Sequence, residues 1–166
     1  MMIFNFKKHN NLLYNTLLKL SRNLYFYKEI GLKDNFETRI YLMFLHFSMI
    51  LIIYKFKKIK FPQAPYDSLF QSIENNLREL GQGDVAVNKK MKDLNKVFYD
   101  ILLKINSEKD KFKVNKSLIL KYFDVLNDSN HKKCDLFIEY YTNFYNFCFE
   151  LPPESMIKDA IKFEVK

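Results

Sequence analysis

Apolar residues recur at helical spacing along most of the chain. From Val87 to Ile105 they follow steps of four and three, which places them on one face of a helix and leaves lysines and aspartates on the opposite face. A shorter stretch from Leu69 to Leu80 has the same period. Only three glycines and four prolines occur, whereas a β fold requires a turn roughly every ten residues. The pattern therefore predicts an all-α fold.

Turn and capping residues divide this pattern into about six to seven helices. A first helix is expected over about residues 10–27, and Gly31 then marks a turn before an N-cap at Asp34–Asn35. Pro62 and Pro65 interrupt the chain before the third helix. The later elements are a solvated loop over residues 106–113, a fifth helix over about 114–126, a sixth that carries an aromatic run up to Phe149, and a short last helix from Pro152 and Pro153. Because no internal repeat or linker interrupts residues 1–166, they are interpreted as one compact domain.

The second helix contains the most apolar segment, in which only His46 and Ser48 interrupt the hydrophobic residues from Ile40 to Tyr54. As a helix this run spans about 22 Å, less than the hydrocarbon thickness of a bilayer, which is about 30 Å. A helix that is apolar on every side usually lies at the centre of a core, and we expect that position here. Two alternatives stay open: docking of residues 40–60 on a membrane surface, because lysines follow the run directly, and a transmembrane segment.

The net charge of +8 is confined to the first third of the chain. Up to Lys60 there are 11 Lys and Arg residues and three acids, so the remainder, with 16 residues of each sign, is neutral. A basic N-terminal third can meet an anionic partner such as membrane lipid or RNA. The alternative is codon bias, because Lys, Asn, Ile and Phe are abundant while Ala and Gly are rare. No nucleic-acid-binding motif is present, and no DNA partner is expected.

No set of residues predicts catalysis, a metal site or a cofactor. His131 and Cys134 have ligand spacing, but a second pair of ligands is lacking, so we expect no zinc. His46 has only apolar residues one turn away, which favours a core or partner-facing residue over a catalytic base. Gly81-Gln82-Gly83 follows no strand and lacks a third glycine, which excludes a dinucleotide fingerprint. The remaining catalytic alternative is an enzyme whose site assembles across helices, with His46 beside two other titratable groups.

The segment from Leu77 to Asp84 predicts a tight corner between the third and fourth helices. Gly81 follows an apolar helix, where a left-handed residue closes the last turn without a Cβ clash. Gly83 is expected to allow a second tight backbone conformation, and Asp84 to N-cap the next helix. This interpretation explains the glycines and Asp84, but it gives the Arg78–Glu79 pair no structural role.

The same corner carries a resemblance to a known family. The run Leu77-Arg78-Glu79-Leu80-Gly81-Gln82-Gly83-Asp84-Val85-Ala86-Val87, followed by Lys89-Lys90-Met91-Lys92 and Phe98-Tyr99, resembles the signature of the ubiquinol–cytochrome c chaperone family. A second pattern of that family is similar to Tyr27, Gly31, Asp34, Phe36, Arg39 and Leu45-His46. The resemblance covers about residues 21–105. The chain departs from it at Ser72 and Glu74, where the family often has aspartates, and at Asn88, where proline or glycine is common.

This resemblance implies a non-catalytic, all-α assembly factor for the cytochrome bc1 complex, which binds newly made cytochrome b or another subunit of that complex. Family members in mitochondria act with a smaller partner chaperone near the ribosome exit on the matrix side, and bacterial relatives are short, single-domain chains. We therefore expect the bacterial cytoplasm, peripheral to the inner membrane, or the matrix side in a eukaryote. The first 20 residues lack the features of a secretory signal, and Cys134 and Cys148 fit a reducing compartment.

The candidate partner-binding residues are polar positions in or beside the family-like motifs: His46, Arg78, Glu79, Asp84, Lys89 and Lys90. The other interpretation of each is a hydrogen-bonded support for the corner. Holding a partner requires an exposed apolar groove with a polar rim, which a helical chain rich in Phe and Tyr can supply. A peripheral lipid-binding protein that uses residues 40–60 is the alternative to the chaperone function.

Overall fold

The computed structural model of the protein describes residues 11–127 and 131–166, and within these ranges the chain forms seven α-helices and no strand. The helices are α2 (Leu12–Ser21), α3 (Phe36–Phe56), α4 (Gln63–Glu79), α5 (Asp84–Lys104), α6 (Lys116–Tyr122), α7 (His131–Phe149) and α8 (Pro153–Asp159). Between and after them lie a π-helical turn at Tyr25–Glu29 and 3₁₀ turns at Asp124–Asn127 and Ala160–Lys162. The predicted all-α fold with six to seven helices is confirmed.

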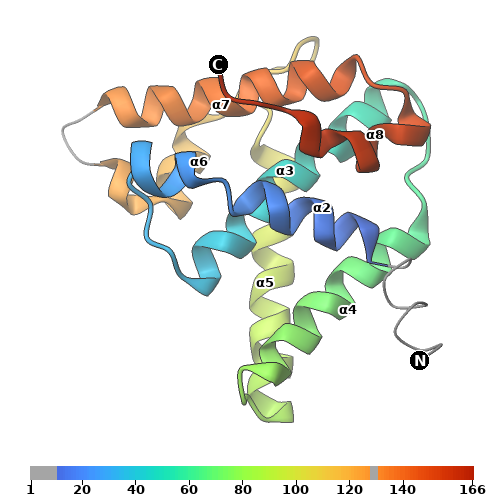
Figure 1. Ribbon diagram of the computed structural model, residues 1–166, viewed down its shortest axis with the longest axis vertical. Helices are drawn as coiled ribbons and strands as arrows, with labels where there is room; N and C mark the ends of the chain where they lie inside the picture. Colours follow the sequence, from blue (N-terminus) through green and yellow to red (C-terminus); the bar gives the residue numbers. More distant parts are fainter. Residues whose placement is uncertain (1–10, 128–130) are drawn as a thin grey trace.

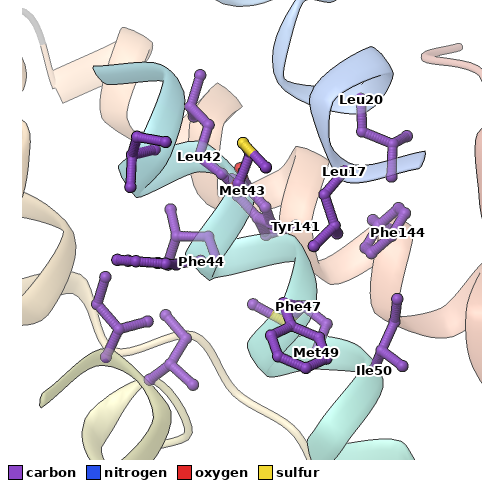
Figure 2. Packing of buried hydrophobic residues seen from close by; sticks show 14 of the residues in the cluster. Leu17, Leu20, Leu42, Met43, Phe44, Phe47, Met49, Ile50, Tyr141 and Phe144 are labelled. Atoms are coloured by element: carbon purple, nitrogen blue, oxygen red, sulfur yellow. The ribbon is translucent and has the colours of Figure 1, made fainter. Parts of the chain in front are cut away.

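Helix α3 lies at the centre of the molecule, where it packs against α2, α5 and α7 (Figure 1). Every residue from Leu42 to Ile50 is buried, so no side of this segment faces solvent. Figure 2 shows side chains of α3 spreading to several sides of the helix, where Leu17 of α2 and Phe144 of α7 meet them. The expectation of an apolar helix at the centre of the core is confirmed.

The same helix is long and apolar enough to cross a membrane, and within the described ranges it is the one helix with that property. It has 21 residues and extends beyond the apolar run from which it was predicted, so the prediction that it is too short was wrong. However, most of the segment is buried inside the molecule, with other helices on several sides. Burial of this kind favours a core helix over a membrane span.

The first helix ends earlier than predicted. Helix α2 stops at Ser21, and the π-helical turn at Tyr25–Glu29 follows only after a break. Polar side chains account for the break, because the Ser21 hydroxyl donates to the Leu18 carbonyl and the Asn23 side-chain oxygen accepts from the Tyr25 amide. Local bonds of this kind compete with the backbone pairing of a helix.

The start of α3 agrees with the prediction. Gly31 has a left-handed φ of 84°, and the Asn35 side chain caps α3 by accepting a hydrogen bond from the Thr38 amide. After α3 the chain turns at Pro62, and Pro65 lies in the first turn of α4, where the missing N–H is not needed. Helices α4 and α5 then form a hairpin that projects away from α7 and α8 (Figure 1).

The segment after α5 is less helical than predicted. An isolated bridge between Asn106 and Val114 closes the predicted loop, so Val114 belongs to the loop and α6 begins after an N-cap at Asn115. The expected fifth helix over 114–126 is therefore a shorter α-helix followed by a 3₁₀ turn. Its expected end at residues 127–130 lies partly outside the described residues. Helix α7 carries the aromatic run, and α8 begins behind Pro152 as predicted.

Candidate functional site

The corner between α4 and α5 is a Schellman turn. Gly81 has a left-handed φ of 88°, and its amide donates to the Arg78 carbonyl while the Gln82 amide donates to the Leu77 carbonyl. A Cβ atom at Gly81 would meet nothing within 4 Å. The requirement for glycine is therefore conformational and not a matter of space.

Two details of the corner differ from the prediction. Gly83 has φ of −76° and ψ of 167°, an extended backbone that any residue can adopt, so it needs no glycine. Gly83 also occupies the N-cap position of α5, which makes Asp84 the first helical residue and not the cap. The Asp84 carboxylate instead lies in the first turn of α5, where the helix dipole favours negative charge.

Arg78 connects the two helices of the corner. Its guanidinium donates to the Asp84 carboxylate at the start of α5 and, at 3.3 Å, to Glu74 in α4. The Asp84 side chain is the main cause that raises the pKa of Arg78. Because Arg78 and Asp84 are exposed, solvent screens their interaction and its contribution to stability is small. The geometry thus gives Arg78 and Asp84 the supporting role at the corner.

The other charged candidates fall into two groups. Lys90 is engaged within the molecule, since its Nζ lies 2.6 Å from Oε1 of Glu37 and joins the start of α5 to the start of α3. Glu79 and Lys89 are exposed, and no charged side chain in the described ranges lies within ion-pair distance of either. Of the six predicted residues, these two are the exposed ones with no ion pair in the described ranges.

Sequence reasoning missed two apolar residues at this corner. Leu80 is 62% exposed and Val85 is 85% exposed. Val85 could have been recognised, because it lies two positions before Val87 and therefore off the apolar face of α5. Figure 1 shows the corner at the free end of the α4–α5 hairpin. We call the exposed residues Glu79, Leu80, Val85 and Lys89 the corner surface.

A small pocket opens beside Leu80, between α2, α3 and α4. It has a volume of about 150 Å³, an apolar lining that includes Met43, and two cationic residues, Arg22 and Arg39. Burial raises the pKa of Tyr14 in the same lining, while the charge of Arg22 opposes the shift and that of Glu79 adds to it. A volume of this size has room for one side chain of a partner. The pocket and the corner surface are continuous through Leu80.

His46 lies in the core and has no exposed surface. Its Nδ1 donates to the Leu42 carbonyl at 2.6 Å, and its Nε2 accepts from the Tyr140 hydroxyl at 2.8 Å. Burial lowers the pKa of His46 to about 3, so the ring is neutral at physiological pH and can donate from one nitrogen while it accepts at the other. His46 therefore links α3 to α7, and the expectation that it belongs to the partner surface is corrected.

The aromatic groups around His46 were also missed. Phe26 and Phe144 approach its ring edge to face, with centroids at 5.9 and 4.8 Å, and the Tyr141 hydroxyl lies 3.3 Å from Nδ1. Tyr140 and Tyr141 are buried as well, and burial raises the pKa of both hydroxyls. No local signal could have found this cluster, because Tyr140 is 94 residues away from His46 in sequence. A substrate has no access to these buried groups in this structure, which counts against the enzyme alternative.

A family model described as ubiquinol-cytochrome C chaperone matches residues 28–115, which is more than half of the chain. The matched segment contains α3, α4, α5 and the corner between them, and it overlaps most of the range 21–105 that carries the resemblance. Neither a curated protein nor a solved structure matches the chain.

Proposed function

Because this chain belongs to the ubiquinol-cytochrome C chaperone family, we propose that it binds newly made cytochrome b and holds it until the bc1 complex assembles. The family supports a chaperone role in assembly of that complex, and the choice of cytochrome b as cargo is our proposal. Holding requires no chemical step, so we assign no catalytic residue, metal or cofactor. We place the protein at the cytoplasmic face of a bacterial inner membrane, or on the matrix side in a eukaryote.

The observation that carries the proposal is the corner surface, which lies within the matched segment. Leu80 and Val85 expose apolar area at the free end of a hairpin, and Glu79 and Lys89 add charge of both signs beside them. Apolar anchors with polar neighbours are typical of protein interfaces. An unassembled subunit of a membrane complex offers apolar surface to such anchors.

The pocket beside Leu80 extends this surface toward α2. A side chain of the cargo that enters it would contact the apolar lining, and a carboxylate at its tip would meet Arg22 and Arg39 at the rim. The Arg78–Asp84 pair has a different part, since it bridges α4 and α5 beside Leu80 and Val85. Arg78 is thus proposed as a support for the surface and Glu79 as part of it.

Aspartate at the two apolar positions tests the proposal. Leu80→Asp and Val85→Asp change exposed side chains, so folding should be little affected. We expect capture of cytochrome b by the tagged protein to fall about tenfold or more, equivalent to about 1.4 kcal/mol, because a carboxylate would be buried in the interface. The matched control is Val125→Asp, an exposed apolar position outside the matched segment, which should capture cytochrome b normally.

Two outcomes distinguish a failure of the chaperone function from a failure of the corner surface as the binding site. Normal haem absorption of the bc1 cytochromes in membranes of cells that lack the protein would refute the chaperone function itself. Normal capture of cytochrome b by both corner variants would refute the corner surface alone. The same pull-down shows whether a small partner chaperone or the ribosome accompanies the cargo.

A further inference from the structure

A second exposed surface lies at the other end of α5. Here the last turns of α3 and α5, with the loop after α5, enclose an open groove of about 540 Å³. Its apolar part is formed by Ile52 and Phe56 of α3 with Leu102 and Leu103 of α5. Phe56 is 43% exposed and Leu103 is 78% exposed, so bulky apolar side chains remain in contact with water. An uncovered groove of this kind indicates a partner that covers it.

The rim of the groove is basic. Lys55, Lys58 and Lys109 line it, and no described acid lies within ion-pair distance of any of the three. The acid in the lining, Glu108, is engaged by Lys111 at 3.5 Å and by Lys113 at 3.6 Å. The groove therefore presents positive charge around an apolar centre.

One of these lysines occupies a strained position. Lys58 has a left-handed φ of 58°, which no other non-glycine residue of the described ranges adopts. It follows the C-cap of α3 in a Schellman turn, where the Ile59 amide donates to the Tyr54 carbonyl and where glycine would be free of strain. Lys55 and Lys57 already supply cations to this helix end, so the helix dipole does not require a third. A charge kept at the expense of stability indicates a function for that charge.

From the groove, its charge and this strain we propose that Phe56, Leu103, Lys55, Lys58 and Lys109 form a membrane-docking patch for a bilayer that contains anionic phospholipid. Phe56 and Leu103 enter the boundary between headgroups and acyl chains, and the lysines meet lipid phosphates. An apolar segment of a protein would fill the groove but would leave three lysines unpaired. Nucleic acid would pair the lysines but would leave the apolar centre in water. An anionic bilayer satisfies both parts of the surface.

This docking differs from docking of the whole segment 40–60, the alternative that the sequence left open. The segment from Leu42 to Ile50 stays buried in the core. Only the last turn of α3 and Lys58 behind it contribute from residues 40–60, together with residues of α5 and its following loop. The patch and the corner surface lie at opposite ends of α5, whose 21 residues span about 30 Å. A molecule docked through the patch directs the corner away from the bilayer. Docking does not depend on the identity of the cargo, so the two proposals stand or fail separately.

Co-flotation of the full chain with lipid vesicles tests the patch. We expect binding to vesicles of phosphatidylcholine mixed with phosphatidylglycerol, little binding to phosphatidylcholine alone, and weaker binding as the salt concentration rises. Leu103→Asp should lower binding roughly tenfold or more, because it places a charge where an apolar side chain inserts. Val85→Asp, at the corner, is the matched control and should bind as the wild type does.

Lys58→Gly keeps the test independent of folding defects. It should lower vesicle binding about fivefold, the effect of one lysine near an anionic surface, while the melting temperature rises because glycine relieves the strain. Failure of the wild type to bind anionic vesicles at low salt would overturn the proposal. Unchanged vesicle binding by both Leu103→Asp and Lys58→Gly would do the same. So would a Leu103→Asp variant that binds vesicles normally but no longer captures cytochrome b, because the occupant of the groove would then be a protein.

Discussion

His46 makes the link between α3 and α7 sensitive to acid. In the folded chain burial lowers its pKa to about 3, against an ordinary value of 6.5 that applies once the chain unfolds. Between these two values the unfolded chain binds a proton that the folded chain excludes. The stability that the neutral, buried His46 gives the fold is therefore fully present above pH 6.5, and it is lost as the pH falls from 6.5 toward about 3.

Replacement of His46 with glutamine should remove this part of the pH dependence. The carboxamide retains a donor for the Leu42 carbonyl and an acceptor for the Tyr140 hydroxyl, but it does not titrate. We expect the wild-type free energy of unfolding to fall by up to about 1.4 kcal/mol for each pH unit in that window, and that of His46→Gln to fall less steeply. Urea denaturation at a series of pH values measures both. Equal slopes for the two proteins would contradict a neutral, buried His46.

At the scale of elements, the corner distinguishes two glycines that look equivalent in the sequence. Gly81→Ser should lower the free energy of unfolding by about 1 kcal/mol or more, because its left-handed φ of 88° disfavours a side chain. Gly83→Ser should raise it by roughly 0.5 kcal/mol, because a hydroxyl at this N-cap can accept from an amide in the first turn of α5. Thermal and urea unfolding of both variants measure the difference. Destabilisation of similar size at both positions would contradict the turn described here.

The helices themselves could be predicted, because the period of the apolar residues is a local property of the sequence. Their ends were less predictable where a single side chain takes over a backbone partner, as Asn23 does after α2. The predicted N-cap of α5, Asp84, was also one residue away from the observed N-cap, Gly83. Prediction of the Arg78–Asp84 pair would have required the angle between α4 and α5, and the period of the apolar residues gives no information about that angle. The exposure of Val85, by contrast, could have been predicted from its position off the apolar face of α5.

At the scale of the whole molecule, α3 is enclosed in the core, and the two exposed surfaces lie at opposite ends of α5. An apolar run has a similar composition in a core and in a membrane, so the sequence of residues 40–54 favoured the core but left the two membrane alternatives open. The choice depends on α2, α5 and α7, which cover this helix. Once α3 is covered, apolar area remains exposed at the corner, through Leu80 and Val85, and at the groove, through Phe56 and Leu103.

These two surfaces should act independently, and a double variant tests that. Val85 and Leu103 lie 18 positions apart on one helix, a distance of about 27 Å at the helical rise. Because no contact joins them over such a distance, the changes in unfolding free energy of Val85→Asp and Leu103→Asp should add within about 0.5 kcal/mol. Val85→Asp should lose cytochrome b and keep vesicle binding, Leu103→Asp should do the reverse, and the double variant should lose both. A coupling in unfolding free energy larger than that limit would contradict the separation of Val85 and Leu103 by a rigid α5. Loss of both activities in either single variant would mean that cargo and membrane share one surface.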